Sequence, residues 1–158
     1  MREFVKSITD KLSTYQFFNF IYPGAVFLGI LKFKGVKIPM LDNVWWLLLA
    51  SYFLGMVISR FGSIVIEWIS VKATLITKYD IKAYAKHLKA DSFTGIILEL
   101  ANIYRTLCAM GLILMVCTII GYNGADKCCM ILLEIMFVIL FWMSFIKQYH
   151  YLLNKLKD

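Results

Sequence analysis

Two arginines, Arg60 and Arg105, stand where apolar runs of this sequence give way to polar residues. Glu67 and Glu99 lie nearby along the chain, so ion pairing and anchoring at a membrane surface would explain both arginines. A guanidinium group can also hold a phosphate through two parallel hydrogen bonds. We therefore expect Arg60 and Arg105 to act either as interfacial anchors or as part of a basic ring that binds an anionic ligand.

A stripe of lysines continues this basic character through the polar middle of the chain. Its members are spaced by four, four and three residues, which places them on one face of a helix; they are Lys78, Lys82, Lys86 and Lys89. A solvated face or a contact with anionic lipid is the default interpretation. The alternative is binding of a nucleotide or nucleic acid, in which lysines read only phosphate. The stripe joins the two arginines as a candidate ligand- or partner-binding set.

Glu134 lies inside an apolar run, CCMILLEIMFVILFW, where an ionisable side chain is costly unless it is paired or wetted. Thr118 falls at a similar depth in the preceding apolar run and is a candidate partner. Glu134 is therefore predicted either to be hydrogen-bonded between helices or to face a pore. Asn19, in the first apolar run, is a second polar candidate for a pore.

Small residues recur at every fourth position in the second apolar run, as Ser51, Gly55, Ser59 and Ser63. Small residues on one helix face let two backbones approach closely, which favours helix association in lipid. This serine–glycine ladder is consistent with packing inside one protomer and with packing between the protomers of an oligomer.

Catalytic and metal-binding patterns are missing from the sequence. There is no G-x-S-x-G, H-E-x-x-H, Walker A or G-x-G-x-x-G motif. The four cysteines form no C-x-x-C pair, and the histidines are limited to His87 and His150. We therefore expect no enzymatic activity, no metal site and no cofactor.

The composition favours lipid as the solvent for much of the chain. Of 158 residues, 61% are hydrophobic and 17% are charged. Globular proteins average about 45–50% apolar and about 25% charged residues. A soluble domain of this size has too little interior to bury so much apolar surface. Membrane topology is then the first explanation for the net charge of +7, because lysine and arginine collect on the cytoplasmic side of membranes.

We therefore predict an all-α integral membrane protein that forms a single membrane domain. The apolar runs predict four transmembrane helices, over residues 17–33, 44–60, 105–122 and 128–146. Each run is slightly short for a span, and each continues into plausible helix at its cytoplasmic end.

Three further segments complete the predicted organisation. Residues 1–16 have the spacing of a short amphipathic helix, and residues 147–158 should form a cytoplasmic tail. Residues 61–104 should form a cytoplasmic helical segment. Its polar part, residues 72–94, contains no proline or glycine, and we therefore expect it to be largely helical.

Charge determines the expected orientation. With four spans and a cytoplasmic amino terminus, most of the 17 basic residues fall on the inside, and the opposite orientation would place them outside. We therefore expect both termini in the cytoplasm and membrane lipid around the spans.

Three segments of the chain, STYQFFNFIYPGAVFLGIL, YFLGMVISRFGSIVIEWI and ELANIYRTLCAM, occur in this order between about residues 13 and 110. The pattern resembles small bacterial membrane proteins encoded in anti-phage defence loci, those of the Kiwa and Hailong types. The resemblance implies a four-helix subunit of a bacterial inner membrane, with a homotetramer favoured, that works with a cytosolic partner protein or its oligonucleotide product.

Two functions are consistent with these observations. The first is an antiviral membrane effector, an oligomeric ion channel or pore gated by a cytoplasmic anionic ligand or partner. The alternative is a non-conducting membrane sensor or scaffold that recruits a cytosolic DNA-binding partner. We prefer the channel at this point, because a lone intramembrane acid is costly without a use.

Overall fold

The apolar runs form helices, which satisfy their own backbone hydrogen bonds as lipid requires. The computed structural model describes residues 17–36, 42–91, 93–121, 124 and 126–157, and within these residues it contains no strand. The helices are η1 (Phe17–Ile21), α2 (Tyr22–Phe33), α3 (Val44–Lys72), α4 (Ile81–Ala90), α5 (Phe93–Gly121) and α6 (Lys127–Lys155). The all-α prediction is confirmed, whereas the predicted amphipathic helix over residues 1–16 lies outside the described residues.

Three helices, α3, α5 and α6, are long and apolar enough to cross a membrane. Each has 29 residues, and at 1.5 Å per residue this gives about 43 Å, more than a hydrocarbon core of about 30 Å. Three of the four predicted spans therefore correspond to apolar parts of longer helices. The first predicted span corresponds to a shorter apolar helix, Asn19–Phe33.

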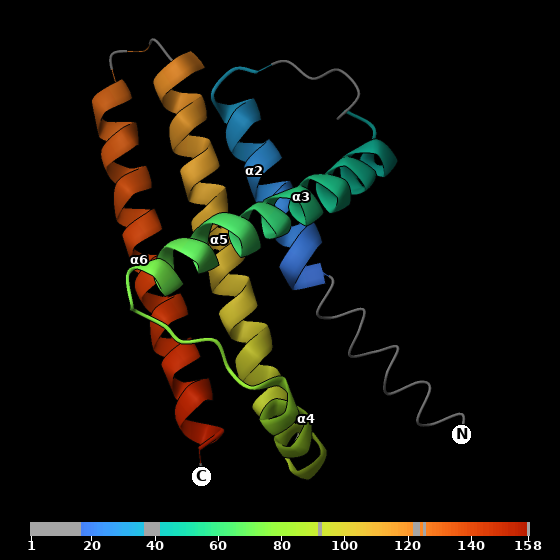
Figure 1. Cartoon of the computed structure of the whole chain (residues 1–158). Coiled ribbons are helices and arrows are strands. Elements are labelled where there is room, and N and C mark those ends of the chain that lie inside the picture. Colours follow the sequence, from blue (N-terminus) through green and yellow to red (C-terminus); the bar gives the residue numbers. More distant parts are fainter. Residues whose placement is uncertain (1–16, 37–41, 92, 122–123, 125, 158) are drawn as a thin grey trace. The chain divides into compact units, whose positions relative to one another are not determined.

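The chain folds as two compact units, Met1–Arg60 and Phe61–Asp158, and α3 contributes to both. In the first unit, α2 crosses the first part of α3 (Figure 1). A Cβ atom added to Gly24 would lie 1.9 Å from the carbonyl oxygen of Ser51, and one added to Gly55 would lie 1.8 Å from that of Phe20. Glycine is needed at both points, because any side chain would separate the two backbones.

The second unit is built on an antiparallel hairpin of α5 and α6, which lie side by side in Figure 1. The inner helix is α5, whose Ala101, Cys108 and Thr118 are fully buried. Gly111 lets α6 approach closely, because a Cβ there would lie 2.8 Å from Val138. Helix α4 packs against α5 at the end of the hairpin opposite the α5–α6 turn.

The polar middle of the chain is less continuously helical than predicted. Helix α3 ends at Lys72, and Thr74 then takes a left-handed conformation with φ of 58°. The next helix starts only after Asp80, whose side chain accepts a hydrogen bond from the Lys82 amide at 2.9 Å. The absence of proline and glycine was therefore not enough to predict one continuous helix, because an aspartate N-cap can also mark the start of a new helix.

Candidate functional site

A partly buried ion pair joins α3 to α5 in the second unit. Nη1 of Arg105 lies 2.8 Å from Oε2 of Glu67, and the two side chains are 14% and 27% exposed. Lipid or packed protein around such a pair strengthens the attraction, but each charge then depends on its partner. The predicted ion-pairing role of Arg105 is therefore confirmed, and its guanidinium group is already engaged by a carboxylate.

Two further contacts bring α3 onto the hairpin beside this ion pair. A Cβ on Gly62 would lie 3.1 Å from the Arg105 carbonyl oxygen and 3.1 Å from the Ala109 Cβ, so the two helices touch there. Eight residues later, Ser70 Oγ accepts a 3.0 Å hydrogen bond from the indole nitrogen of Trp142 on α6. The second part of α3 is thus fastened to both helices of the hairpin.

Aromatic side chains continue the contacts around the Arg105–Glu67 ion pair toward the end of the hairpin where α4 packs. We call this its polar end. The ring centroid of Tyr79 lies 5.5 Å from that of Tyr84 on α4 and 6.1 Å from that of Tyr149 on α6. Burial raises the pKa of the Tyr79 phenol above its ordinary value of 10.0, with the charge of Glu67 adding to the rise and Arg105 opposing it. Tyr79 therefore stays neutral, and its ring contacts join the linker after α3 to α4 and α6.

Asp91 forms the corner between α4 and α5 and uses both of its carboxylate oxygens. Oδ1 accepts a 2.8 Å hydrogen bond from the Phe93 amide at the start of α5, and Oδ2 accepts one of 2.5 Å from Lys155 at the end of α6. The Lys155 ammonium also lies 4.6 Å from the centroid of the Phe93 ring. Hydrogen bonding from Lys155, and then from the Phe93 amide, lowers the pKa of the Asp91 carboxyl.

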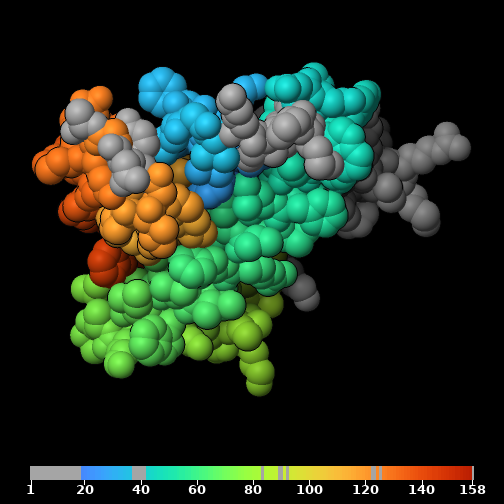
Figure 2. All heavy atoms as spheres, turned by 90° about the horizontal axis from the view of Figure 1, so that it is seen from above, coloured from blue at the N-terminus to red at the C-terminus, as the bar shows by residue number. Residues whose placement is uncertain are grey.

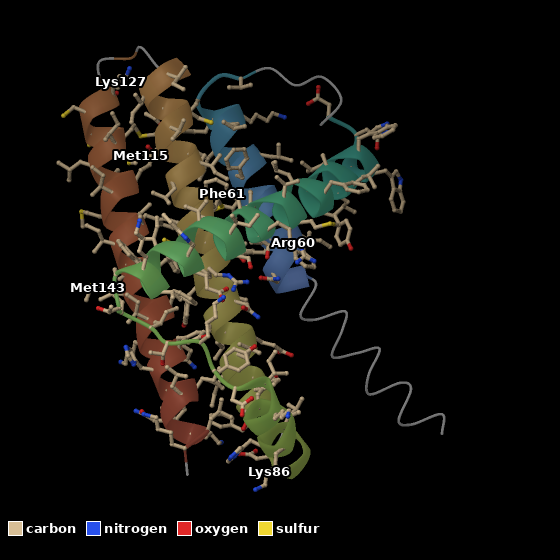
Figure 3. All side chains as sticks on the ribbon, viewed as in Figure 1. Arg60, Phe61, Lys86, Met115, Lys127 and Met143 are labelled. Atoms are coloured by element: carbon tan, nitrogen blue, oxygen red, sulfur yellow. The ribbon has the colours of Figure 1, made fainter. Side chains whose placement is uncertain are left out.

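The lysine stripe is only partly a helical face. Lys82 and Lys86 are exposed on α4, and Figure 3 places Lys86 at the end of the hairpin opposite Lys127. Lys78 is exposed too, but it lies in the linker before α4. Lys89 falls in α4, and its side chain lies outside the described residues. The predicted single stripe is therefore wrong at Lys78, because the helix begins after Asp80.

Glu134 has the partner that the sequence predicted. The Thr118 hydroxyl on α5 lies 2.7 Å from Oε1 of Glu134 on α6, and it also lies 2.9 Å from the Leu114 carbonyl oxygen. A hydroxyl partner in the span offsets part of the cost of an acid in lipid. This geometry agrees with the prediction that Glu134 is hydrogen-bonded between two helices, and it does not require Glu134 to face a pore.

The serine–glycine ladder also finds partners within its own chain. Ser51 and Gly55 face the backbones of Gly24 and Phe20, as described above, and Ser59 Oγ lies 3.4 Å from Nδ2 of Asn19. Asn19 is 2% exposed, so its side chain packs between helices. Packing within one protomer therefore accounts for three members of the ladder, whereas Ser63 belongs to the second unit.

Arg60 is exposed and belongs to the first unit, whereas Arg105 and the lysines of the stripe belong to the second. Neither arginine lies at a helix end, because both helices continue well beyond the apolar run.

Sequence reasoning missed the Asp91–Lys155 corner and the Ser70–Trp142 hydrogen bond. Asp91 carries a usable signal, an aspartate two residues before an apolar helical run, whereas nothing in the sequence pairs Ser70 with Trp142.

The four cysteines are free thiols, and no group of metal-binding side chains gathers among the residues that the structure describes. Among the residues that the structure describes, the fold is all-helical, and three of its helices are long and apolar enough to cross a membrane. No family model, curated protein or solved structure matches the chain. Functional assignment therefore depends on the contacts described above.

Proposed function

We propose that this protein is a multi-pass membrane scaffold or sensor that recruits a cytosolic partner through the polar end of its hairpin. The shorter apolar helix, Asn19–Phe33, would be a fourth span, which would place both termini in the cytoplasm. The resemblance to defence components supplies the setting, a bacterial inner membrane during phage infection.

The observation that carries this proposal is the fixed position of α4. The Asp91–Lys155 contact fastens the α4–α5 corner to the end of α6, while Lys82 and Lys86 stay exposed. A fixed basic surface attracts an acidic protein surface or bound nucleic acid without ordering either side chain first. Arg105 is less suited to a phosphate, because Glu67 already holds its guanidinium group.

The test compares charge reversal with charge conservation on α4. Lys82→Glu with Lys86→Glu should abolish membrane recruitment of the cytosolic protein that co-purifies with the wild type, measured by fractionation of infected cells. Lys82→Arg with Lys86→Arg should retain it, because the positive charges are kept. Equal recruitment by both double variants would reject a role for the α4 surface.

The second candidate function is an ion channel, which Glu134 favours because it is an acid within a candidate span. A homotetramer would supply four copies of this side chain around an axis. Purified protein in planar bilayers should then conduct, and Glu134→Gln should change the conductance. A flat current trace, with and without short oligonucleotides, would leave the scaffold as the better function.

A further inference from the structure

We propose that residues 61–72 of α3 lie in the plane of the membrane interface and bind the lipid surface through Phe61, Ile64 and Trp68. Helix α3 as a whole is long enough to span a membrane, so this part would otherwise be expected to run along the bilayer normal. The proposal concerns only the part of α3 that belongs to the second unit. It is independent of the proposed recruitment, but if residues 44–60 form a span it requires α3 to bend near Arg60.

The first support is that this part of α3 contacts α5 and α6 at a single level. Gly62 touches α5 beside Arg105, and Ser70 meets Trp142 on α6 eight residues later, about 12 Å along α3. A helix running parallel to the hairpin would instead contact it at levels about 12 Å apart.

Arg105 and Trp142 lie at nearly the same height on the hairpin. The residues that precede them, Tyr104 and Phe141, have ring centroids 6.2 Å apart. In Figure 1, residues 61–72 accordingly run across the direction of α5 and α6. In the view from above of Figure 2, the green atoms of this part of α3 and of the residues that follow it appear below the orange ends of α5 and α6.

The second support is the chemistry of the hairpin at this level. Between Leu107 and Gly121 the sequence of α5 has no charged residue, whereas Arg105 and Glu99 lie on the other side of this boundary. On α6, the apolar run ends at Lys147, five residues after Trp142. The crossing therefore occurs where the hairpin changes from apolar to polar, which is the level of a headgroup region.

The third support is the distribution of residues around α3 itself. Glu67 pairs with Arg105 and is close enough to Tyr79, at the polar end of the hairpin, to raise the pKa of the Tyr79 phenol. Helical periodicity places Val65 and Ile69 on the opposite side, and both are only half-buried. A helix with a polar side toward water and an apolar side toward lipid is typical of one lying in an interface.

The outward face of this part of α3 is apolar and bears an interfacial aromatic. Ile64 is 71% exposed, Trp68 61% and Phe61 37%. The Lys72 ammonium lies 4.8 Å from the centroid of the Trp68 ring. Tryptophan with an adjacent lysine is favoured at the boundary between acyl chains and headgroups, where the ring is partly buried and the ammonium meets phosphate.

Depth measurements distinguish an interfacial helix from a transmembrane one. The full chain, with Trp45 and Trp46 replaced by phenylalanine, is placed in phosphatidylcholine vesicles containing lipids brominated at defined depths. Trp142 is kept, because its indole nitrogen donates to Ser70. The tryptophan under study is at position 68, or at position 61 through Phe61→Trp with Trp68→Phe, and the signal of Trp68→Phe alone, which contains only Trp142, is subtracted. Two exposed α6 positions with the same seven-residue spacing, Met136→Trp and Met143→Trp, each with Trp68→Phe, provide the control.

The control pair should differ in depth by about 10 Å, because seven residues of a spanning helix rise by that distance. Positions 61 and 68 should instead differ by less than about 3 Å, with both near the headgroups. A difference matching the control pair would overturn the proposal and show that α3 continues through the bilayer. Absence of lipid quenching at both positions would also overturn it, because the face would then be covered by protein, such as a second copy, or by water.

Discussion

Arg105 on α5 and Glu67 on α3 form a 2.8 Å ion pair that is only partly accessible to solvent. These residues are separated by 38 positions in the chain. Their contact brings α3 and α5 together and so closes the loop that the linker and α4 form between them. The pair lies between the apolar part of the hairpin and its polar end, so it connects a membrane-facing region with the α4 surface.

Breaking this ion pair from one side should destabilise the protein strongly. Glu67→Ala leaves the Arg105 charge partly buried without its carboxylate, and we expect the free energy of unfolding to fall by about 3 kcal/mol. Chemical unfolding in detergent micelles, followed by circular dichroism, measures the change. Adding Arg105→Met to Glu67→Ala should restore much of the stability, because no unpaired charge then remains.

Arg60→Ala is the matched control for this experiment. Its side chain is exposed, so its removal should change the free energy of unfolding by no more than about 0.5 kcal/mol. An equal loss of stability in Arg60→Ala and Glu67→Ala would contradict a specific role for the ion pair.

The glycine contacts of the first unit predict a sharp difference among conservative substitutions. Gly24→Ala or Gly55→Ala places a methyl group less than 2 Å from a backbone oxygen, so α2 and α3 must separate. We expect a loss of about 2–4 kcal/mol, seen as rapid proteolysis of the first unit in micelles. Gly29→Ala has nothing within 4 Å of the new methyl group, and it should be neutral or stabilising.

The same substitutions address oligomerisation. Because Gly55 contacts Phe20 of its own chain, any folded Gly55→Ala protein should keep the wild-type stoichiometry in native mass analysis. A change of stoichiometry without a change in protease resistance would instead place the serine–glycine ladder between protomers.

The hydroxyl of Thr118 should contribute modestly to the stability of the hairpin. Thr118→Val removes its hydrogen bond to Glu134 and keeps the shape, so we expect a loss of about 1 kcal/mol. Thr118→Ser keeps the hydroxyl and should retain more of the stability than Thr118→Val. Indistinguishable unfolding curves for the two variants would mean that the hydrogen bond contributes nothing measurable.

The Asp91 corner predicts a stability change at acidic pH. Since the pKa of the Asp91 carboxyl is lowered in the folded state, its stabilising effect is complete above the unfolded value of about 3.9. The effect is lost as the pH falls below that value and through the folded pKa. Comparing thermal unfolding of the wild type and Asp91→Asn between pH 6 and pH 2 should show a difference that shrinks with acidification. A constant difference across this range would exclude the Lys155 contact as its cause.

The sequence alone determined much of the fold, because helix formation in lipid is a local property. Apolar runs of sufficient length, with their backbones hydrogen-bonded internally, predicted the three long helices. The Glu134–Thr118 contact was also accessible, since two antiparallel spans joined by a short turn bring residues of equal depth together. The proposed first span remains a prediction, because its apolar helix is shorter than the others.

Only the tertiary structure decided how the polar residues are used. Periodicity placed Lys78 with Lys82 and Lys86, but a helix boundary set by the Asp80 side chain separated them. Spacing could not choose between the two interpretations of the serine–glycine ladder, because a small residue permits close approach to any neighbouring helix. The crossing direction of residues 61–72 was equally undetermined, since it depends on Gly62 and Ser70 meeting side chains and backbone that are distant in the chain.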